Sequence, residues 1–138
     1  MTEVFVHSHT VGDDEIDEQS RASNIAFVAW LQAAAIAHSA ALGWTTERYR
    51  QLGKGWVVRS HTIEYLGPAL AGERILVETQ VADMKKVTSV RIYRVLREAD
   101  HQLLAKAETN WAFVDYATGR PTRIPAEIAH AYAAAAPR

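Results

Sequence analysis

The stretch that decides the fold runs from residue 14 to residue 42 and reads DEIDEQSRASNIAFVAWLQAAAIAHSAAL. It begins with a cluster of acids, passes through a short polar turn, and continues from Asn24 as a long apolar segment. This pattern predicts a helix that is apolar on nearly every face and therefore belongs to a hydrophobic core. The polar side chains between residues 25 and 42 are few: Gln32, His38 and Ser39.

Local signals define both ends of this predicted helix. Ser23 is a good N-cap, and Gly43 is a good residue to follow the last turn. An acidic loop that leads into the N-terminus of a buried helix places carboxylates beside aligned backbone N–H groups that lack partners. Such an arrangement can hold a carbonyl oxygen while a carboxylate directs an attack on its carbon.

Composition narrows the class of protein. With 138 residues, 49% of them hydrophobic and 22% charged, the chain predicts one globular domain over residues 1–138. A net charge of −1 gives no reason to expect a nucleic-acid partner. The chain has no cysteine, which excludes a disulfide and a thiolate nucleophile and suits a reducing compartment.

Neither the N-terminus nor the apolar segment predicts a targeting or membrane signal. The sequence MTEVFVH has no basic region followed by an apolar core, so it does not predict a signal peptide. The apolar segment has about the length of a membrane span, but its Gln32, His38 and Ser39 would be unpaired in lipid. We expect a soluble, cytoplasmic protein with no membrane partner.

Beyond Gly55 the hydrophobic period changes to two, which predicts strands rich in Val, Ile, Thr, Tyr and Trp. Their close spacing predicts antiparallel hairpins, since a parallel crossover needs a dozen or more residues. With a first strand before the long helix, the order predicts an α+β fold in which an antiparallel sheet wraps around one long buried helix. The predicted strands are Thr2–Val11, Trp56–Leu66, Arg74–Ala82, Val87–Arg97 and Gln102–Asp115, and further short helices are predicted at residues 45–53 and after Pro125.

One small sheet around one helix leaves an edge strand unprotected. Two copies that join their sheets edge to edge would remove this edge. The sequence therefore predicts a homodimer or a dimer of dimers.

The acidic cluster admits two interpretations. It can be a solvated loop whose charges favour the following helix by a few tenths of a kcal/mol each. Alternatively, Asp17 can fold back over the helix start, seven residues before Asn24, and act in catalysis. The carboxylates concerned are Asp13, Asp14, Glu15, Asp17 and Glu18.

The segment from Glu15 to Trp30 resembles the 4-hydroxybenzoyl-CoA thioesterase branch of the hotdog superfamily, whose members carry Asp-x-Asp-x-x-Gly-His-Val-Asn-Asn-x-x-Tyr-x-x-Trp. Here the second acid falls on Asp17, the last Asn on Asn24, the aromatic residue on Phe27 and the Trp on Trp30. Two later segments, residues 63–73 and 109–121, are similar to the Pro–Gly-acid turn and the last strand of that family. The resemblance covers about residues 3–125.

The resemblance implies a hotdog-fold hydrolase of acyl-CoA or acyl-carrier-protein thioesters. It implies that Asp17 is the catalytic carboxylate, and that a backbone N–H at the helix start, assisted by Asn24, stabilises the oxyanion. Such a reaction needs no metal or other cofactor, because the thiolate leaves readily and the carbonyl is already electrophilic.

The chain departs from the family where Ser20-Arg21 replaces Gly-His and Ala22-Ser23 replaces Val-Asn. A Gly at position 20 would permit a turn with positive φ that Ser adopts reluctantly, so a different loop shape is expected. Arg21 has three interpretations: it neutralises Asp17, contacts a substrate phosphate, or caps the acidic loop.

Other residues are predicted to contact substrate. The resemblance implies this for Phe27, for His61 on a strand that can approach the partner's site, and for Lys85 and Lys86 as a site for coenzyme A phosphates. The alternative for each is a structural or solvated role. His7 and His9 lie on one face of a strand and would need a third ligand to hold a metal, so no metal site is predicted.

Two other functions remain open from the sequence. The first is a hotdog enoyl-thioester hydratase or dehydratase, although the Asp-x-x-x-x-His pattern of such enzymes does not occur between Asp13 and the helix. The second is a non-catalytic acyl-thioester-binding protein, which the loss of the Gly-His pair makes plausible.

Overall fold

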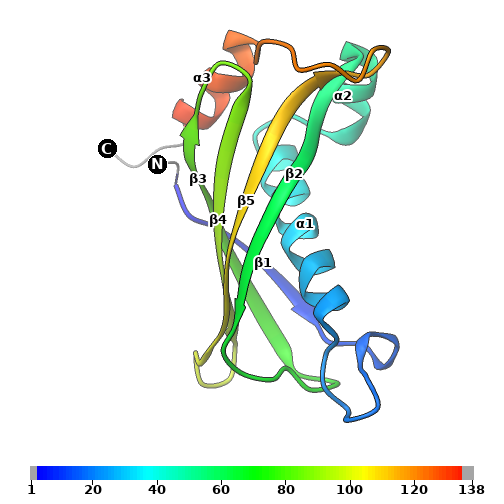
Figure 1. The fold of residues 1–138 in the computed structure, drawn as a ribbon. Coiled ribbons are helices and arrows are strands. Elements are labelled where there is room, and N and C mark those ends of the chain that lie inside the picture. The colour runs from blue at the N-terminus through cyan, green and yellow to red at the C-terminus, as the bar shows by residue number, and fades with distance from the viewer. Residues whose placement is uncertain (1–2, 135–138) are drawn as a thin grey trace.

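A computed structural model of the chain describes residues 3–134. A five-stranded antiparallel sheet carries one long helix across one of its faces (Figure 1). The elements are, in chain order, β1 (Phe5–Thr10), a 3-10 turn (Asp13–Glu15), α1 (Asn24–Ala41), α2 (Thr46–Leu52), β2 (Lys54–Tyr65), β3 (Arg74–Met84), β4 (Thr88–Arg97), β5 (Leu103–Asp115) and α3 (Ala126–Ala134). This confirms the predicted α+β hotdog architecture. Every strand end lies within two residues of the predicted one except the start of β1, which is Phe5; the predicted start, Thr2, lies outside the described residues.

The strand order across the sheet is β1-β3-β4-β5-β2, so β1 and β2 are the two edges. Strands β3, β4 and β5 form the two hairpins that their spacing predicted. Strand β2 pairs with β5 rather than with β3, and its register shifts between Val58 and Ser60. Arg59, an exposed residue, lies at this shift.

Helix α1 begins and ends where its capping residues predicted. The Ser23 hydroxyl accepts a hydrogen bond from the Ala26 N–H at 3.1 Å. Gly43 follows the helix with a φ of +91°, a conformation that residues with a Cβ rarely adopt.

The sheet covers only one side of α1, which corrects the expectation of a helix buried all round. On the other side Ile25 is 77% exposed and Ile36 is 55% exposed. The reason is geometric, because a single five-stranded sheet packs against one stripe of a helix. The buried residues of α1 are Ala26, Phe27, Trp30, Leu31, Ala34, Ala35, His38 and Ser39.

Among the described helices, α1 alone has the length and apolar composition of a membrane span, and its buried stripe packs on the sheet.

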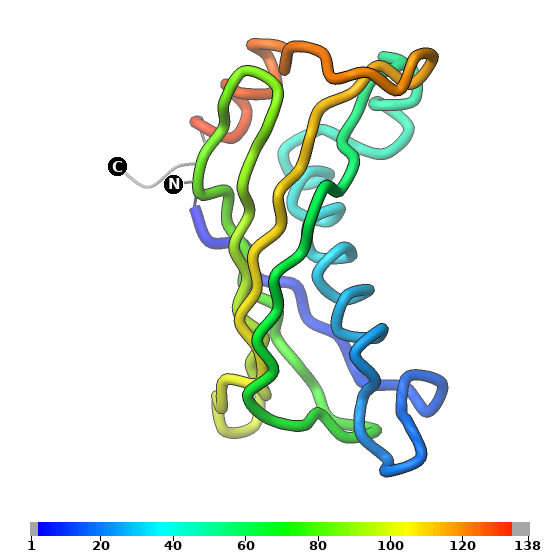
Figure 2. The backbone as a smooth tube through the Cα atoms, in the orientation of Figure 1, coloured from blue at the N-terminus to red at the C-terminus, as the bar shows by residue number. Residues whose placement is uncertain are grey.

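Loops gather at the two ends of the sheet (Figure 2). At one end lie the loop from Val11 to Ser23, the β2–β3 connection and the β4–β5 turn. At the other end lie the β3–β4 turn, α2 and α3, where a second apolar cluster closes the core. That cluster contains Trp44, Tyr49, Val81, Phe113, Ile124, Ile128 and Tyr132.

Candidate active site

The acidic loop before α1 is closed by its own backbone. The Asp17 N–H donates to the Arg21 carbonyl at 2.7 Å, and the Ser23 N–H donates to the Glu15 carbonyl at 2.9 Å. A bridge between Ile16 and Ala22 lies between these two bonds. Residues 15–23 therefore form a short hairpin-like loop that ends at the N-cap of the helix.

Asp17 is exposed, and one of its two carboxylate oxygens is fixed by the backbone. Its Oδ1 accepts hydrogen bonds from the Gln19 N–H at 2.8 Å and from the Arg21 N–H at 3.2 Å. Within residues 3–134 its Oδ2 accepts no hydrogen bond. The carboxylate is thus oriented by one oxygen and free at the other.

Ser20 adopts the conformation that a glycine would adopt at this position. Its φ is +63°, in the left-handed region that costs a residue with a Cβ about 1–2 kcal/mol. The expected difference in loop shape from the family stays a prediction; in this chain Ser20 adopts the left-handed conformation despite its Cβ. The bonds of Asp17 to the loop backbone explain how the strain is tolerated.

Glu15 is tied into the protein more firmly than Asp17. Its carboxylate accepts from the Gly12 N–H at 2.9 Å and from the Trp30 Nε1–H at 2.7 Å, and it lies 2.6 Å from His9 Nε2. Burial opposes ionisation of Glu15, but these hydrogen bonds outweigh it and hold its pKa below the usual value. Glu15 therefore anchors the loop to β1 and α1.

The β2–β3 connection supports the other side of the loop. The Ala22 N–H donates to the Ala69 carbonyl at 2.7 Å, and Arg21 pairs with Leu70 in a backbone bridge.

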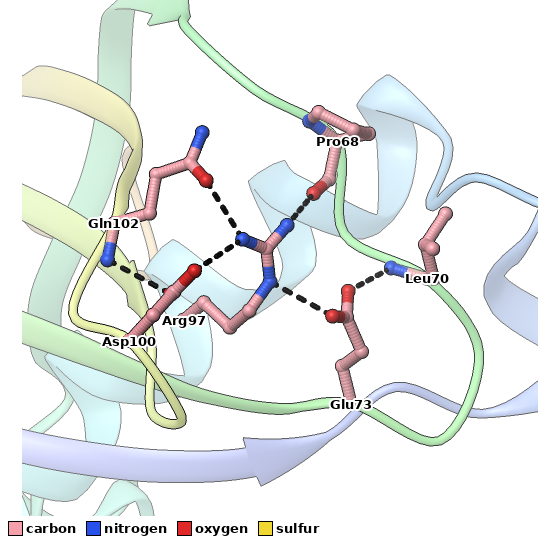
Figure 3. A network of polar contacts seen from close by, with 6 residues as sticks. All are labelled: Pro68, Leu70, Glu73, Arg97, Asp100 and Gln102. Atoms are coloured by element: carbon pink, nitrogen blue, oxygen red, sulfur yellow. Dashed lines mark hydrogen bonds and ion pairs between the residues drawn. The ribbon is translucent and has the colours of Figure 1, made fainter.

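Arg97 holds this connection in place (Figure 3). Its guanidinium donates to the Pro68 carbonyl at 2.9 Å and forms ion pairs with Glu73 at 2.8 Å and Asp100 at 3.1 Å. The Glu73 carboxylate in turn accepts from the Leu70 N–H at 2.6 Å. The acidic loop is therefore supported by the β2–β3 connection, which Arg97 in turn ties to the β4–β5 turn.

The start of α1 presents free donors to the outside. Asn24 and Ile25 are both exposed, and neither backbone N–H has an acceptor among the described residues. The first N–H groups of a helix are unpaired and carry the positive end of its dipole. This end of the molecule thus holds an exposed carboxylate and exposed backbone donors on one continuous segment.

The predicted substrate-contacting residues are only partly brought together. Arg21 is exposed in the loop, and its guanidinium makes no ion pair with any described residue. Phe27 is 3% exposed and packs on Trp30, with ring centroids 4.7 Å apart, so it is a core residue in the single chain. Its ring also meets the exposed Tyr65 edge-on at 5.3 Å, near the end of β2.

His61 lies on the edge strand β2 and is held by Thr109, with 2.7 Å between Nδ1 and Oγ1. Burial lowers its pKa below the usual value.

Lys85 and Lys86 are exposed in the β3–β4 turn, at the opposite end of α1 from Asp17. That helix has 18 residues and, at ~1.5 Å per residue, is about 27 Å long, so in a single chain the lysines are remote from the acidic loop.

A cavity of about 490 Å³ lies between the C-terminal half of α1 and the sheet. Its mouth is formed by exposed residues, among them Gln32, Ile36, Val57 and Tyr116. Its buried walls include Trp44, Tyr49, Val81 and Tyr132 from the second apolar cluster, together with Ser89 and Arg91 of β4. Its size is within the range of small-molecule sites.

Sequence reasoning did not single out Arg91. The buried face of β4 carries Ser89, Arg91, Tyr93 and Val95. The other face also mixes polar and apolar residues, so the sequence did not reveal which face is buried. A signal was present, however, in His38, which is a polar residue on a buried helix and needs a partner. That partner is Arg91, at 2.9 Å from His38 Nδ1.

His7 and His9 lie on β1 as expected, and His9 is engaged by Glu15. Within residues 3–134 no group of three or more His, Asp or Glu side chains is arranged to hold a metal ion.

The fold and the loop at the helix start define a hotdog-fold domain, and comparison with known proteins identifies its family. The family model of the Thioesterase-like superfamily matches residues 11–132. The chain therefore belongs to this superfamily, which confirms the thioester hydrolase class that the sequence predicted.

Solved structures share this fold over nearly the whole chain. A 1,4-dihydroxy-2-naphthoyl-CoA thioesterase from Synechocystis is 17% identical, with a TM-score of 0.88 over 95% of this chain and 96% of that one. A Staphylococcus aureus protein solved in complex with CoA is 16% identical, with a TM-score of 0.89 over 100% of this chain and 89% of that one.

A candidate oleoyl thioesterase from Lactobacillus plantarum is 24% identical, with a TM-score of 0.89 over 96% of this chain. This chain spans only 51% of the length of that protein.

Proposed function

We propose that this protein hydrolyses acyl-CoA thioesters with Asp17 as the catalytic carboxylate. The observation that carries the proposal is the hydrogen bonding of that carboxylate. Its Oδ1 accepts from two backbone N–H groups, while its Oδ2 accepts from none among the described residues. An oriented carboxylate beside a helix start can activate water or attack the thioester carbonyl directly. Solved relatives described as CoA thioesterases, and one described as a complex with CoA, support coenzyme A as the carrier.

The unpaired N–H groups of Asn24 and Ile25 are the proposed oxyanion donors. Because they belong to the first turn of an 18-residue helix, they are rigid and need no reorganisation when charge develops on the carbonyl oxygen. The Asn24 side chain is exposed beside them and is proposed to orient the attacking water or the carbonyl.

We further propose that the site is completed by a second copy. Strand β2 is a free edge, and Ile25 and Ile36 are exposed on the side of α1 that the sheet leaves uncovered. A two-fold axis that pairs β2 with its copy must run the two strands antiparallel. The helix start of one chain then lies beside the C-terminal half of α1 in the other chain, where the cavity opens.

The same arrangement gives the lysines a role. The β3–β4 turn of one chain comes to the end of the molecule that holds the partner's acidic loop. Lys85 and Lys86, with Arg21 of the partner, are then the proposed contacts of the coenzyme A phosphates, and His61 on the paired edge is a proposed contact of the substrate. A cytoplasmic location stays a prediction.

A panel of acyl-CoA substrates, assayed with a thiol-detecting reagent, tests the reaction. Release of free CoA by the wild-type protein, lost in Asp17→Asn, is the expected result. Hydration of crotonyl-CoA without CoA release would show the hydratase instead, and binding without turnover would show an acyl-thioester-binding protein. Acyl-carrier-protein thioesters in the same panel distinguish the carrier.

Sedimentation equilibrium tests the assembly. At micromolar concentration we expect no appreciable 15.3 kDa species. An active monomer would overturn both the dimer and the shared site.

A further inference from the structure

A charged residue lies in the wall of the cavity beside the C-terminal half of α1. Arg91 is 4% exposed, and it donates hydrogen bonds to His38 Nδ1 at 2.9 Å, Thr79 Oγ1 at 3.2 Å and the Tyr132 hydroxyl at 3.3 Å. A guanidinium in a protein stays protonated, so the cavity carries a permanent positive charge.

The partners of Arg91 do not balance this charge. The Thr79 and Tyr132 hydroxyls are neutral, and burial together with the charge of Arg91 lowers the pKa of His38 to about 4, so His38 is neutral near pH 7. No carboxylate of residues 3–134 forms an ion pair with Arg91. A buried charge without a counter-ion is costly to keep out of water.

Arg97 on the same strand shows the usual solution. It is also largely buried, and it forms ion pairs with both Glu73 and Asp100 (Figure 3). The difference is that Arg97 supports a set of turns, whereas Arg91 lines a cavity. The counter-ion missing at Arg91 is therefore expected to come from a ligand.

The rest of the cavity indicates what kind of ligand this is. Trp44, Val81 and Ile36 provide apolar walls, and its mouth lies between α1 and the edge strand β2. Phosphates of coenzyme A carry several charges and strong hydration, and one cation among apolar walls does not suit them. A single carboxylate at the end of a hydrocarbon chain or ring matches both the charge and the walls.

We propose that the cavity binds an acyl group whose far end carries a carboxylate, and that this carboxylate pairs with Arg91. The inference rests on the proposed function for the thioester end, which the partner's helix start would hold at the mouth of the cavity. The substrate class is then the CoA thioester of a dicarboxylic acid, with one carboxyl group esterified and the other free.

Pairs of substrates that differ only at the far end test this proposal. Adipyl-CoA is compared with hexanoyl-CoA, and suberyl-CoA with octanoyl-CoA. The wild-type kcat/KM should favour the carboxylated member of at least one pair by about 10-fold or more, as expected for a charge-assisted hydrogen bond in a buried site. Arg91→Met should abolish or invert that preference.

Arg94→Met is the matched control. Arg94 is on the same strand, exposed, and paired with Glu78 at 3.1 Å on the outer face of the sheet. It should keep the wild-type preference. An equal loss in both folded variants would overturn the proposal. A wild-type preference for the neutral member of both pairs would overturn it even if Arg91→Met failed to fold.

A binding measurement separates this inference from the proposed reaction. Calorimetry with hexanoate alone should show binding to the wild-type protein, little binding to Arg91→Met, and little binding of the neutral isostere hexanamide to either. If no acyl-CoA is hydrolysed, the proposed function fails but this result still stands. If hexanoyl-CoA is hydrolysed while hexanoate and hexanamide bind alike, the reaction stands and the carboxylate site does not.

Discussion

The two ends of helix α1 hold their chemical groups in opposite ways. At the N-terminal end, Asp17 and the free N–H groups are exposed, and the backbone fixes them. At the C-terminal half, Arg91 is buried, and side chains from a helix and a neighbouring strand, His38 and Thr79, fix it. The first region is suited to a reaction common to many thioesters, and the second to a choice among acyl groups.

This difference predicts where a substitution should matter most. Around Ser20 and Arg21 the loop is shaped by hydrogen bonds of the backbone, so a change of side chain there should leave its shape in place. At Arg91 the charge itself is what we propose the cavity uses, so a neutral side chain there should remove the proposed preference.

Asp17→Asn should give the largest effect and tests the N-terminal end alone. The amide oxygen can still accept from Gln19 and Arg21, so the loop should keep its shape while the carboxylate function is lost. We expect kcat to fall by on the order of 10²–10⁴. Steady-state kinetics measures this, with Glu18→Gln as the exposed, neighbouring control; a folded Asp17→Asn protein with near-normal turnover would remove Asp17 from the reaction.

The pH dependence of stability tests the buried end. The pKa of His38 is lowered from 6.5 to about 4 in the folded chain, so the unfolded chain binds more protons between these values. Stability should therefore fall as the pH is lowered from about 6.5 to about 4, by up to about 3 kcal/mol from this residue at 1.36 kcal/mol per pKa unit.

Urea unfolding of wild type and His38→Asn at a series of pH values measures this contribution. The variant should lose stability less steeply over that window, because its amide does not titrate. His130→Asn, which removes an exposed imidazole of α3, should follow the wild-type profile. Identical slopes in His38→Asn and wild type would show that burial and the charge of Arg91 do not hold His38 neutral.

Much of the fold was predictable because its signals are local. The Ser23 cap, Gly43, the change of hydrophobic period after Gly55 and the turn residues between strands each act within a few positions, and each predicted its element correctly. The identity of the edge strands was not predictable in this way, since the pairing of β2 with β5 depends on contacts between distant residues.

Only those residues of the candidate site that lie close together in the sequence could be predicted from it. Asp17 and Asn24 are close in sequence and share one loop and helix start. The contact between Arg91 and His38 joins residues 53 positions apart, and nothing local in β4 distinguishes the face that carries Arg91 from the face that carries Arg94.

Asn24→Ala should have an intermediate effect at the N-terminal end. If its amide orients the reacting groups, its loss should lower kcat about 10-fold and change KM less, since an interaction made mainly in the transition state appears in kcat. Gln51→Ala removes an exposed amide of α2 and serves as the control. Unchanged kcat would leave Asn24 with a structural role in starting the helix, and the oxyanion would rest on backbone N–H groups alone.

The smallest effect is expected from Lys85→Ala combined with Lys86→Ala, and it separates an exposed charge from the buried one. Contact with phosphates remote from the thioester acts equally on substrate and transition state, so KM should rise a few-fold with kcat nearly unchanged. Exposed charges are screened by salt, so the wild-type KM should rise between about 0.05 and 0.5 M salt while that of the double variant responds less. The preference for a carboxylated acyl group, which depends on buried Arg91, should by contrast persist over the same salt range.

Lys106→Ala, which removes an exposed charge on β5, is the control. An equal salt response in all three proteins would show that Lys85 and Lys86 form only a solvated turn.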